Sequence, residues 1–166
     1  IDTSDFLARF RKVGTHEKVL LVAAQPFSDI KEIYPQIKNT LDEIKRKVYQ
    51  SALPGERDLK FLFDKIEADI ALDNKNYGKA TLILENAIQS HATSINDTLR
   101  GLAMLKRAFV KMRNINRAFE IQYMIESRWH RKSDTVHIDY GTPKSTLYGL
   151  LGLKTEAIKQ RRIEFN

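Results

Sequence analysis

Apolar side chains recur every three or four residues along most of this chain, which is the spacing of one face of an α-helix. The clearest case is 56–74, where one stripe contains Leu59, Leu62, Phe63, Ile66, Ile70 and Ala71. Similar stripes predict further helices over about 4–13, 16–24, 28–48, 77–91, 94–113, 115–131, 143–151 and from 155 onward. Pro35 lies inside the 28–48 stripe, and we expect it to kink that helix.

Short polar or glycine-containing segments separate these stripes. Leu53-Pro54-Gly55 is the clearest break, because proline and glycine both oppose continuation of a helix. Residues 135–140 alternate apolar and polar side chains, and we expect an extended connector there, since no partner strand is evident. With 7 glycines and 4 prolines among 166 residues, the composition favours helix nearly throughout. We therefore predict an all-α fold.

One short phrase occurs three times, each time at the start of a predicted helix. It is found at Tyr77-Gly-Lys-Ala80, Ile115-Asn-Arg-Ala118 and Lys154-Thr-Glu-Ala157, so its alanines follow one another at nearly equal intervals. A fixed period of roughly 40 residues is typical of a repeat array, in which neighbouring helix pairs stack to bury apolar faces that one pair cannot bury alone. We expect such repeats over 56–166, packed as one domain, and an N-terminal helical pair or capping segment over 1–55.

These phrases resemble the second helix of the tetratricopeptide repeat, in which small residues allow close helix approach and a larger one fills the gap beside them. The resemblance implies a right-handed stack of antiparallel helix pairs, a TPR-like α–α superhelix. The period exceeds the family's usual length of about 34 residues, so longer helices or connectors are expected. A generic helical bundle is the alternative. The residues expected to pack the repeats are Tyr77, Ala80, Leu84, Ala87, Phe109, Ala118, Tyr148 and Ala157.

Two residues of the second unit depart from the family pattern. Lys106 stands where a small residue is expected, and Gln122 stands where an aromatic residue is expected. The segment 147–159 also resembles repeats in the sensor regions of bacterial membrane-bound histidine kinases and related regulators, which lie outside the cytoplasmic membrane. A chain that begins at Ile1 fits a trimmed mature region, so an extracytoplasmic, periplasmic location is favoured over a cytoplasmic one.

The chain is basic, with a formal net charge of +7 and a sequence pI of about 9.6. This charge permits contact with nucleic acid or an anionic membrane, but 21 acidic residues are interspersed among the 28 basic ones. The absence of cysteine excludes disulfides, zinc–thiolate sites and thiol catalysis. No apolar run is long enough to cross a membrane.

A candidate binding groove follows from the charges on the first helix of two units. Arg100, Arg107 and Lys111 share one stripe of the predicted 94–113 helix, since they are separated by seven and four positions. The equivalent stripe one unit earlier carries Lys65, Asp69 and Asp73. In the resembling family the first helix of each unit lines the concave groove, which implies a surface for the carboxylate or acidic side chains of a peptide. The alternative is that these charges only keep the helices soluble.

No catalytic constellation is evident in the sequence. The four histidines are scattered, and there is no glycine-rich phosphate loop and no nucleophile elbow. His130 and Asp134 precede the 135–140 connector and His137 and Asp139 lie within it; a solvated charged loop is favoured there over a metal site. We therefore expect no enzyme activity, no metal and no cofactor.

The sequence thus predicts a non-catalytic protein- or peptide-binding module, the sensory or scaffolding region of a bacterial signalling protein. The alternative is a nucleic-acid-binding regulator that uses a basic helical surface from Arg100 to Lys132, where Trp129 is flanked by cations. Self-association through the end of the stack is a further possibility. No membrane span is expected.

Overall fold

The computed structural model describes residues 1–50, 56–129 and 143–164, and these residues are helical with no strand among them. The prediction of an all-α fold is confirmed. The first helices are α1 (Thr3–Lys12), α2 (Thr15–Ala23), α3 (Phe27–Ile30), α4 (Tyr34–Gln50) and α5 (Glu56–Asp73). They are followed by α6 (Tyr77–Asn86), a π-helical turn η1 (Ala87–His91), α7 (Ile95–Lys111), α8 (Ile115–Trp129), α9 (Lys144–Leu150) and α10 (Lys154–Glu164).

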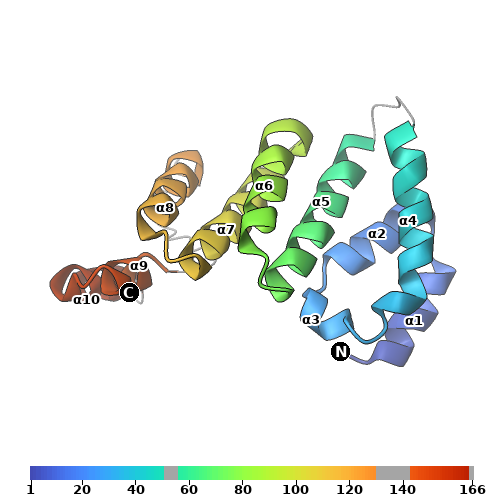
Figure 1. The fold of residues 1–166 in the computed structure, drawn as a ribbon, viewed down its shortest axis with the longest axis horizontal. Coiled ribbons are helices and arrows are strands. Elements are labelled where there is room, and N and C mark those ends of the chain that lie inside the picture. The colour runs from blue at the N-terminus through green and yellow to red at the C-terminus, as the bar shows by residue number, and fades with distance from the viewer. Residues whose placement is uncertain (51–55, 130–142, 165–166) are drawn as a thin grey trace.

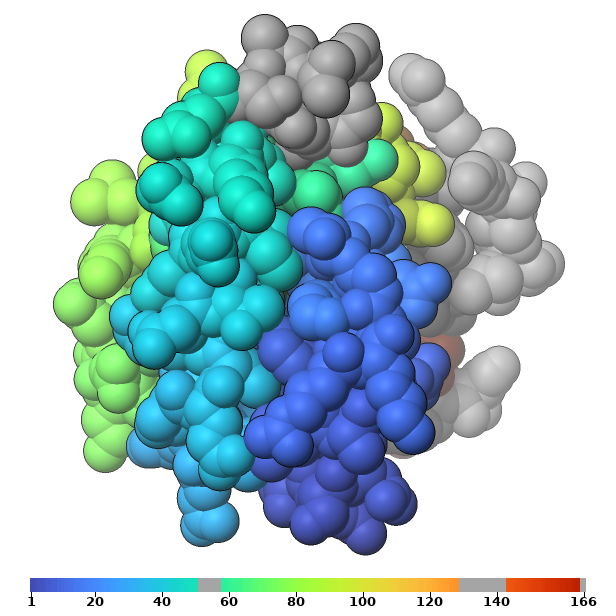
Figure 2. Space-filling view, turned by 90° about the vertical axis from the view of Figure 1, so that its right-hand side faces the viewer, coloured from blue at the N-terminus to red at the C-terminus, as the bar shows by residue number. Residues whose placement is uncertain are grey.

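Helices that follow one another along the chain also lie next to one another in space (Figure 1). From α5 onward each helix packs against the helix before it and the helix after it, so that α5–α6, α7–α8 and α9–α10 form three successive hairpins. The helices α1–α4 cover the free side of α5 and form one end of the molecule. Figure 2 looks onto this end and shows α1 and α2 in blue beside α4 in cyan. The α9–α10 hairpin forms the other end.

The three hairpins close with the same turn. Lys75, Arg113 and Gly152, one in each turn, are the described residues with positive φ, at 59°, 61° and 78°. At each turn the backbone N–H of the next residue reaches back across the helix end, as is typical of a left-handed C-terminal cap. These three bonds run from Asn76 to Ala71 (2.8 Å), from Asn114 to Phe109 (2.9 Å) and from Leu153 to Tyr148 (3.0 Å).

The caps of the following helices are also repeated. The side chains of Asn76 and Asn114 accept hydrogen bonds from the backbone N–H groups of Lys79 and Arg117, respectively, at the third position of each helix. An asparagine at this position satisfies one of the amide groups that a helix start leaves without a partner. Within the described residues, the interval between the repeated phrases of the sequence is therefore also the interval between turns of the same backbone geometry.

The prediction of one kinked helix over 28–48 was wrong. Two helices are present, α3 and α4, and Lys31–Ile33 form a turn between them. Pro35 occupies the second position of α4, where its missing N–H costs no intrahelical hydrogen bond. The apolar stripe nevertheless stays on one side of both helices, because Ile30, Ile33 and Ile37 are all buried.

The predicted helix over 77–91 also differs in its last turn. After Asn86 the backbone widens into η1, where the Ala92 N–H donates to the carbonyl oxygen of Ala87 at 2.9 Å, the wider spacing of a π-helix. Gly101 of α7 lies against this turn. A Cβ atom at Gly101 would lie 2.7 Å from Ile88 Cγ1, so glycine is required for the close approach of the two segments.

Two apolar cores meet at α5. The first core joins α1–α4 to one side of α5 through residues such as Phe10, Val19, Ile37 and Phe63. The second core runs through α5–α9 and includes Ala68, Leu102 and Ile125. Because α5 contributes to both cores, the N-terminal helices and the hairpins share a buried element.

The predicted connector at 135–140 lies outside the described residues. Within 1–50, 56–129 and 143–164, every helix is too short or too polar to cross a bilayer.

Candidate functional site

Three of the six predicted groove residues, all on α5, contact the chain's own N-terminal helices. Lys65 Nζ donates to the carbonyl oxygen of Ala23 at 2.7 Å, at the C-terminal end of α2. Asp69 Oδ2 accepts the backbone N–H of Phe27 at 2.6 Å, at the start of α3. Each charge complements the helix end that it contacts, since a helix exposes carbonyl groups at its C-terminus and N–H groups at its N-terminus.

The third residue of this stripe extends the same contact. Asp73 pairs with Lys31 at 2.9 Å, just beyond α3. Burial, followed by the nearby charge of Arg100, lowers the pKa of Lys65 below its ordinary value. The hollow beside Lys65 and Asp69 is open to solvent on one side, has a volume of about 10 Å³ and is lined by α2, α3, α5 and Gln25, so it has room for about one water molecule. The stripe on α5 therefore stabilises the packing of the N-terminal helices against α5.

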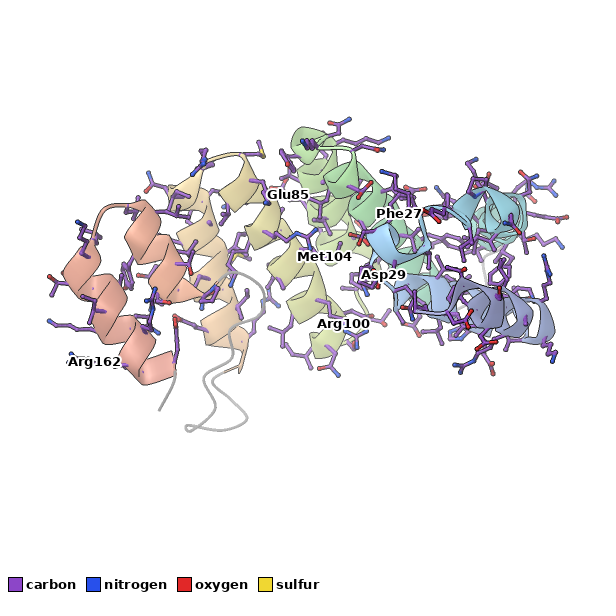
Figure 3. The ribbon with its side chains drawn as sticks, turned by 90° about the horizontal axis from the view of Figure 1, so that it is seen from below. Phe27, Asp29, Glu85, Arg100, Met104 and Arg162 are labelled. Atoms are coloured by element: carbon purple, nitrogen blue, oxygen red, sulfur yellow. The ribbon has the colours of Figure 1, made fainter. Side chains whose placement is uncertain are left out.

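The other three predicted groove residues lie on α7 and are exposed. Arg100, Arg107 and Lys111 are spaced along one face of the helix, with half-buried Met104 between the first two. Figure 3 shows Arg100 and Met104 on α7 as seen from below, with Phe27 and Asp29 of α3 on the neighbouring part of the molecule. Within the described residues no carboxylate forms an ion pair with any of these three cations.

The two stripes carry opposite charges at equivalent places. When the first two hairpins are aligned on their turns, Arg107 takes the place of Asp69, and Lys111 takes the place of Asp73. On α5 these positions bind an amide N–H and a lysine, whereas on α7 they present two cations to solvent. A ligand for the α7 stripe must therefore carry acceptors or negative charge.

The residues predicted to pack the repeats lie mostly in the interior. Ala80, Leu84, Ala87, Phe109 and Ala118 are buried. Tyr77, Tyr148 and Ala157 are half-buried. The Tyr148 ring contacts the Phe119 ring of α8, with centroids 5.0 Å apart, and so connects the second and third hairpins.

The two departures of the second unit are hydrogen-bonded to each other. Lys106 is fully buried on α7, and its Nζ donates to Oε1 of Gln122 on α8 at 2.7 Å. Gln122 Nε2 in turn donates to Glu126 Oε1 at 3.2 Å, and the same carboxylate oxygen pairs with Lys144 of α9 at 3.2 Å. This polar chain links three helices. Its signal in the sequence was the pair of unexpected polar residues, which sequence reasoning treated as separate mismatches.

A second polar contact lies where α4, α5 and η1 meet. His91 Nδ1 is 2.5 Å from Oδ2 of buried Asp64, and the ring of His91 stands edge-on to Tyr49. Burial raises the pKa of the Asp64 carboxyl, and the hydrogen bond to His91 acts in the opposite direction. Burial and the charge of Asp64 raise the pKa of Tyr49 to about 12. Sequence reasoning missed the pair of Asp64 and His91, because its members lie on different helices and far apart along the chain.

Within the part of the chain that the structure describes, no three histidine or carboxylate side chains come together as metal ligands. The charged connector with His130 and Asp134 lies outside that part, as do Arg131 and Lys132 at the end of the basic surface that was predicted from Arg100 to Lys132. Arg128 is exposed near the end of α8.

Searches against protein-family models, curated proteins and solved structures found no significant match to this chain.

Proposed function

We propose that this protein is a non-catalytic binding module, a stack of helix pairs resembling tetratricopeptide repeats, whose α7 stripe binds an acidic peptide segment of a partner protein. Support for the repeat comes from the three similar turns at Lys75, Arg113 and Gly152 and from the two asparagine caps. A right-handed superhelix is the architecture that this resemblance implies.

The observation that carries the proposal is the different use of two equivalent stripes. On α5, Asp69 and Asp73 bind groups of the N-terminal helices. On α7, Arg107 and Lys111 occupy the equivalent positions and are exposed. Arg100 is a third exposed cation on the same face of the helix. The contacts of the α5 stripe indicate that these positions suit recognition of a peptide segment, and the reversed charge selects a ligand with carboxylates.

The resemblance of 147–159 to repeats in bacterial sensor regions supports a sensory or scaffolding role in signalling. In such a role the partner's acidic segment is the signal or the scaffolded component. A rigid helical surface limits the ordering cost of binding, which suits weak and reversible recognition.

The test is a binding measurement with labelled peptides rich in Asp and Glu, using fluorescence anisotropy at several salt concentrations. The double variant Arg107→Gln, Lys111→Gln is expected to weaken binding about tenfold, since each lost charged contact is worth roughly 0.5–1 kcal/mol at an exposed site. The matched control is Arg46→Gln, Lys79→Gln, which removes two exposed cations from α4 and α6.

Equal weakening in both double variants would mean that peptides respond only to net charge, and the proposal would then be wrong. Single-stranded DNA and RNA are tested in parallel as the competing ligand. If nucleic acid binds far more tightly than any peptide, with affinity falling steeply as salt rises, the basic face serves a nucleic-acid regulator instead.

A further inference from the structure

The charged stripe of α5 is covered by one continuous segment of the chain. Residues 23–31 extend from the last residue of α2 to the residue after α3, and they lie against α5 (Figure 1). Three hydrogen bonds join the segment to the stripe, and each connects residues that are 42 positions apart in the sequence: Ala23 with Lys65, Phe27 with Asp69, and Lys31 with Asp73. Successive contacts are therefore four residues apart on both sides.

The constant separation shows the direction and the compactness of the covering segment. Because both sides advance together, residues 23–31 run in the same direction as α5. Four residues of an α-helix span about 6 Å along its axis, whereas four residues of an extended chain span about 13 Å. A segment that stays in register with α5 over three contacts is therefore helical or tightly turned.

An apolar contact accompanies the polar ones. Ile66 of α5 is buried in the same core as Phe27 and Ile30 of α3. The same three side chains line the hollow of about 10 Å³ between α2, α3 and α5, so the segment packs closely against the helix. The covered stripe on α5 therefore combines an apolar position with polar positions before and after it along the helix.

The equivalent face of α7 is less covered. When the first two hairpins are aligned on their turns, four positions of this face correspond: Leu62 to Arg100, Ile66 to Met104, Asp69 to Arg107, and Asp73 to Lys111. Leu62 and Ile66 are buried on α5, whereas Arg100 is exposed and Met104 is half-buried on α7. Within the part of the chain that the structure describes, the face of α7 thus has no counterpart of residues 23–31.

The side chains of this face select the chemistry of an occupant. Arg107 replaces a carboxylate that accepts the N–H at a helix start, so a helix start is disfavoured there and a helix must continue past it. Lys111 replaces an acidic residue that binds a lysine, so it selects a carboxylate instead. Met104 keeps the apolar character of its position. Arg100 lies seven residues before Arg107 on the same face and selects another carboxylate.

We propose that the acidic ligand of the α7 stripe is an α-helical segment of the partner that runs in the same direction as α7. Its apolar side chain packs against Met104, and its carboxylates pair with Arg100, Arg107 and Lys111. Its contact residues are therefore acidic, apolar, acidic and acidic in this order, separated by four, three and four positions as on α7. The inference rests on the function proposed for the stripe, to which it adds the conformation, direction and residue order of the ligand.

The experiment compares two fluorescein-labelled peptides by fluorescence anisotropy. Both have the same helix-favouring alanine and glutamine host and the same four contact residues at the same spacing. The first has the order Glu, Leu, Glu, Glu. The second exchanges the two central residues, which gives the order of the first peptide read backward. We expect the first to bind at least about tenfold more tightly, because the second places glutamate against Met104 and leucine against Arg107.

Two further comparisons test the conformation and the register. A third peptide is the first with prolines between its contact residues, and it should lose binding because proline opposes helix formation. The variant Met104→Lys, Arg107→Met exchanges the two central side chains of the stripe and should prefer the second peptide. The matched control Lys79→Met, Leu82→Lys makes the same kind of exchange between exposed residues of α6 and should keep the native preference. Circular dichroism checks that both variants are folded.

The outcomes separate this inference from the function on which it rests. Equal or tighter binding of the second peptide by the native chain would overturn the inferred direction, and undiminished binding of the proline-containing peptide would overturn the helical conformation. In either case the proposed function stands if Arg107→Gln, Lys111→Gln weakens the peptides that bind. If that variant weakens none of them, the function proposed for the stripe is wrong, and this inference is wrong with it.

Discussion

Lys106 and Gln122 occupy the places that Ala68 and Leu84 fill in the first hairpin, and each of the two polar residues is accommodated by the other. A buried ammonium group is costly without acceptors, and the Gln122 oxygen is one of its acceptors. The pair replaces an apolar contact of the first hairpin with a hydrogen bond in the second. A difference of this kind between units helps to fix which helix of the chain pairs with which.

We predict that Gln122→Leu lowers the free energy of unfolding by about 2–3 kcal/mol, because the buried ammonium of Lys106 loses a charged hydrogen bond. Lys106→Met, Gln122→Leu should recover most of that loss, since apolar groups of similar size replace both partners. Urea denaturation of the two single variants and the double variant measures the coupling. Purely additive losses would contradict the hydrogen bond as the source of the effect.

Asp64 leads to a prediction about pH. Because burial raises its pKa, the folded state favours the neutral carboxyl, and the resulting stability is full below the unfolded pKa of about 3.9 and lost as pH rises through the folded value. Asp64→Asn keeps a neutral hydrogen-bonding group beside His91. The variant should therefore gain stability relative to the native chain as the pH rises from about 4 to about 7.

The measurement is urea unfolding at several pH values, with Asp42→Asn as the control. Asp42 is exposed and pairs with Lys38 on the surface of α4, so its replacement should show little dependence on pH. A difference between Asp64→Asn and the native chain that stays constant over this pH range would falsify the assignment of burial as the dominant influence.

At the scale of elements, α7 packs closely against η1 at Gly101, which has no side chain. Gly101→Ala should lower the free energy of unfolding by about 1–3 kcal/mol, because the new Cβ would overlap Ile88, although alanine favours helix. Gly149→Ala in α9 is the matched control. Its Cβ would meet no atom within 4 Å, so it should stabilise the protein by up to about 1 kcal/mol.

The same pair of variants can be checked in a second background. In Ile88→Ala the obstructing Cγ1 atom is gone, and Gly101→Ala should then become neutral or stabilising relative to that background. Thermal unfolding by circular dichroism is sufficient for this comparison. If Gly101→Ala is destabilising in both backgrounds, the close approach to Ile88 is not its cause.

Helix positions were predictable because amphipathic stripes such as Leu59–Ala71 repeat a regular spacing. The break at Lys31–Ile33 was not, since Ile30, Ile33 and Ile37 keep helical spacing straight through the turn. The π-helical turn at Ala87–His91 was equally invisible. It packs through Ile88 against Gly101, and spacing along the chain carries no information about that distant neighbour.

At the scale of the whole molecule, α2 and α3 are attached to α5 by charges that sequence reasoning assigned to a groove. The sequence identified Lys65, Asp69 and Asp73 as a stripe, but whether a stripe faces solvent or another helix depends on what packs there. The equivalent positions on α7 are exposed instead. The position of the stripe on α5 was predictable from the sequence. Its contacts with the N-terminal helices were not.

Asp69→Ala should lower the free energy of unfolding by about 1–3 kcal/mol, because the N–H of Phe27 loses a charged acceptor at the start of α3. Hydrogen exchange should become faster in α2 and α3 and stay unchanged in α8 and α9. Asp73→Ala is the control, with an expected effect below about 0.5 kcal/mol, since its partner Lys31 is exposed. Faster exchange throughout the chain would instead indicate that Asp69 supports both cores.

The repeated turn has a consequence for how such a chain can change in length. Residues 77–114 begin just after one turn and end just after the next, so their removal joins Asn76 to Ile115 in the sequence context that Asn114 has now. Duplicating them joins Asn114 to a second copy of Tyr77, in the sequence context that Asn76 has now. Gain or loss of residues 77–114 therefore requires no new backbone conformation at the junction. The length of the helical stack can change by one pair of helices at a time.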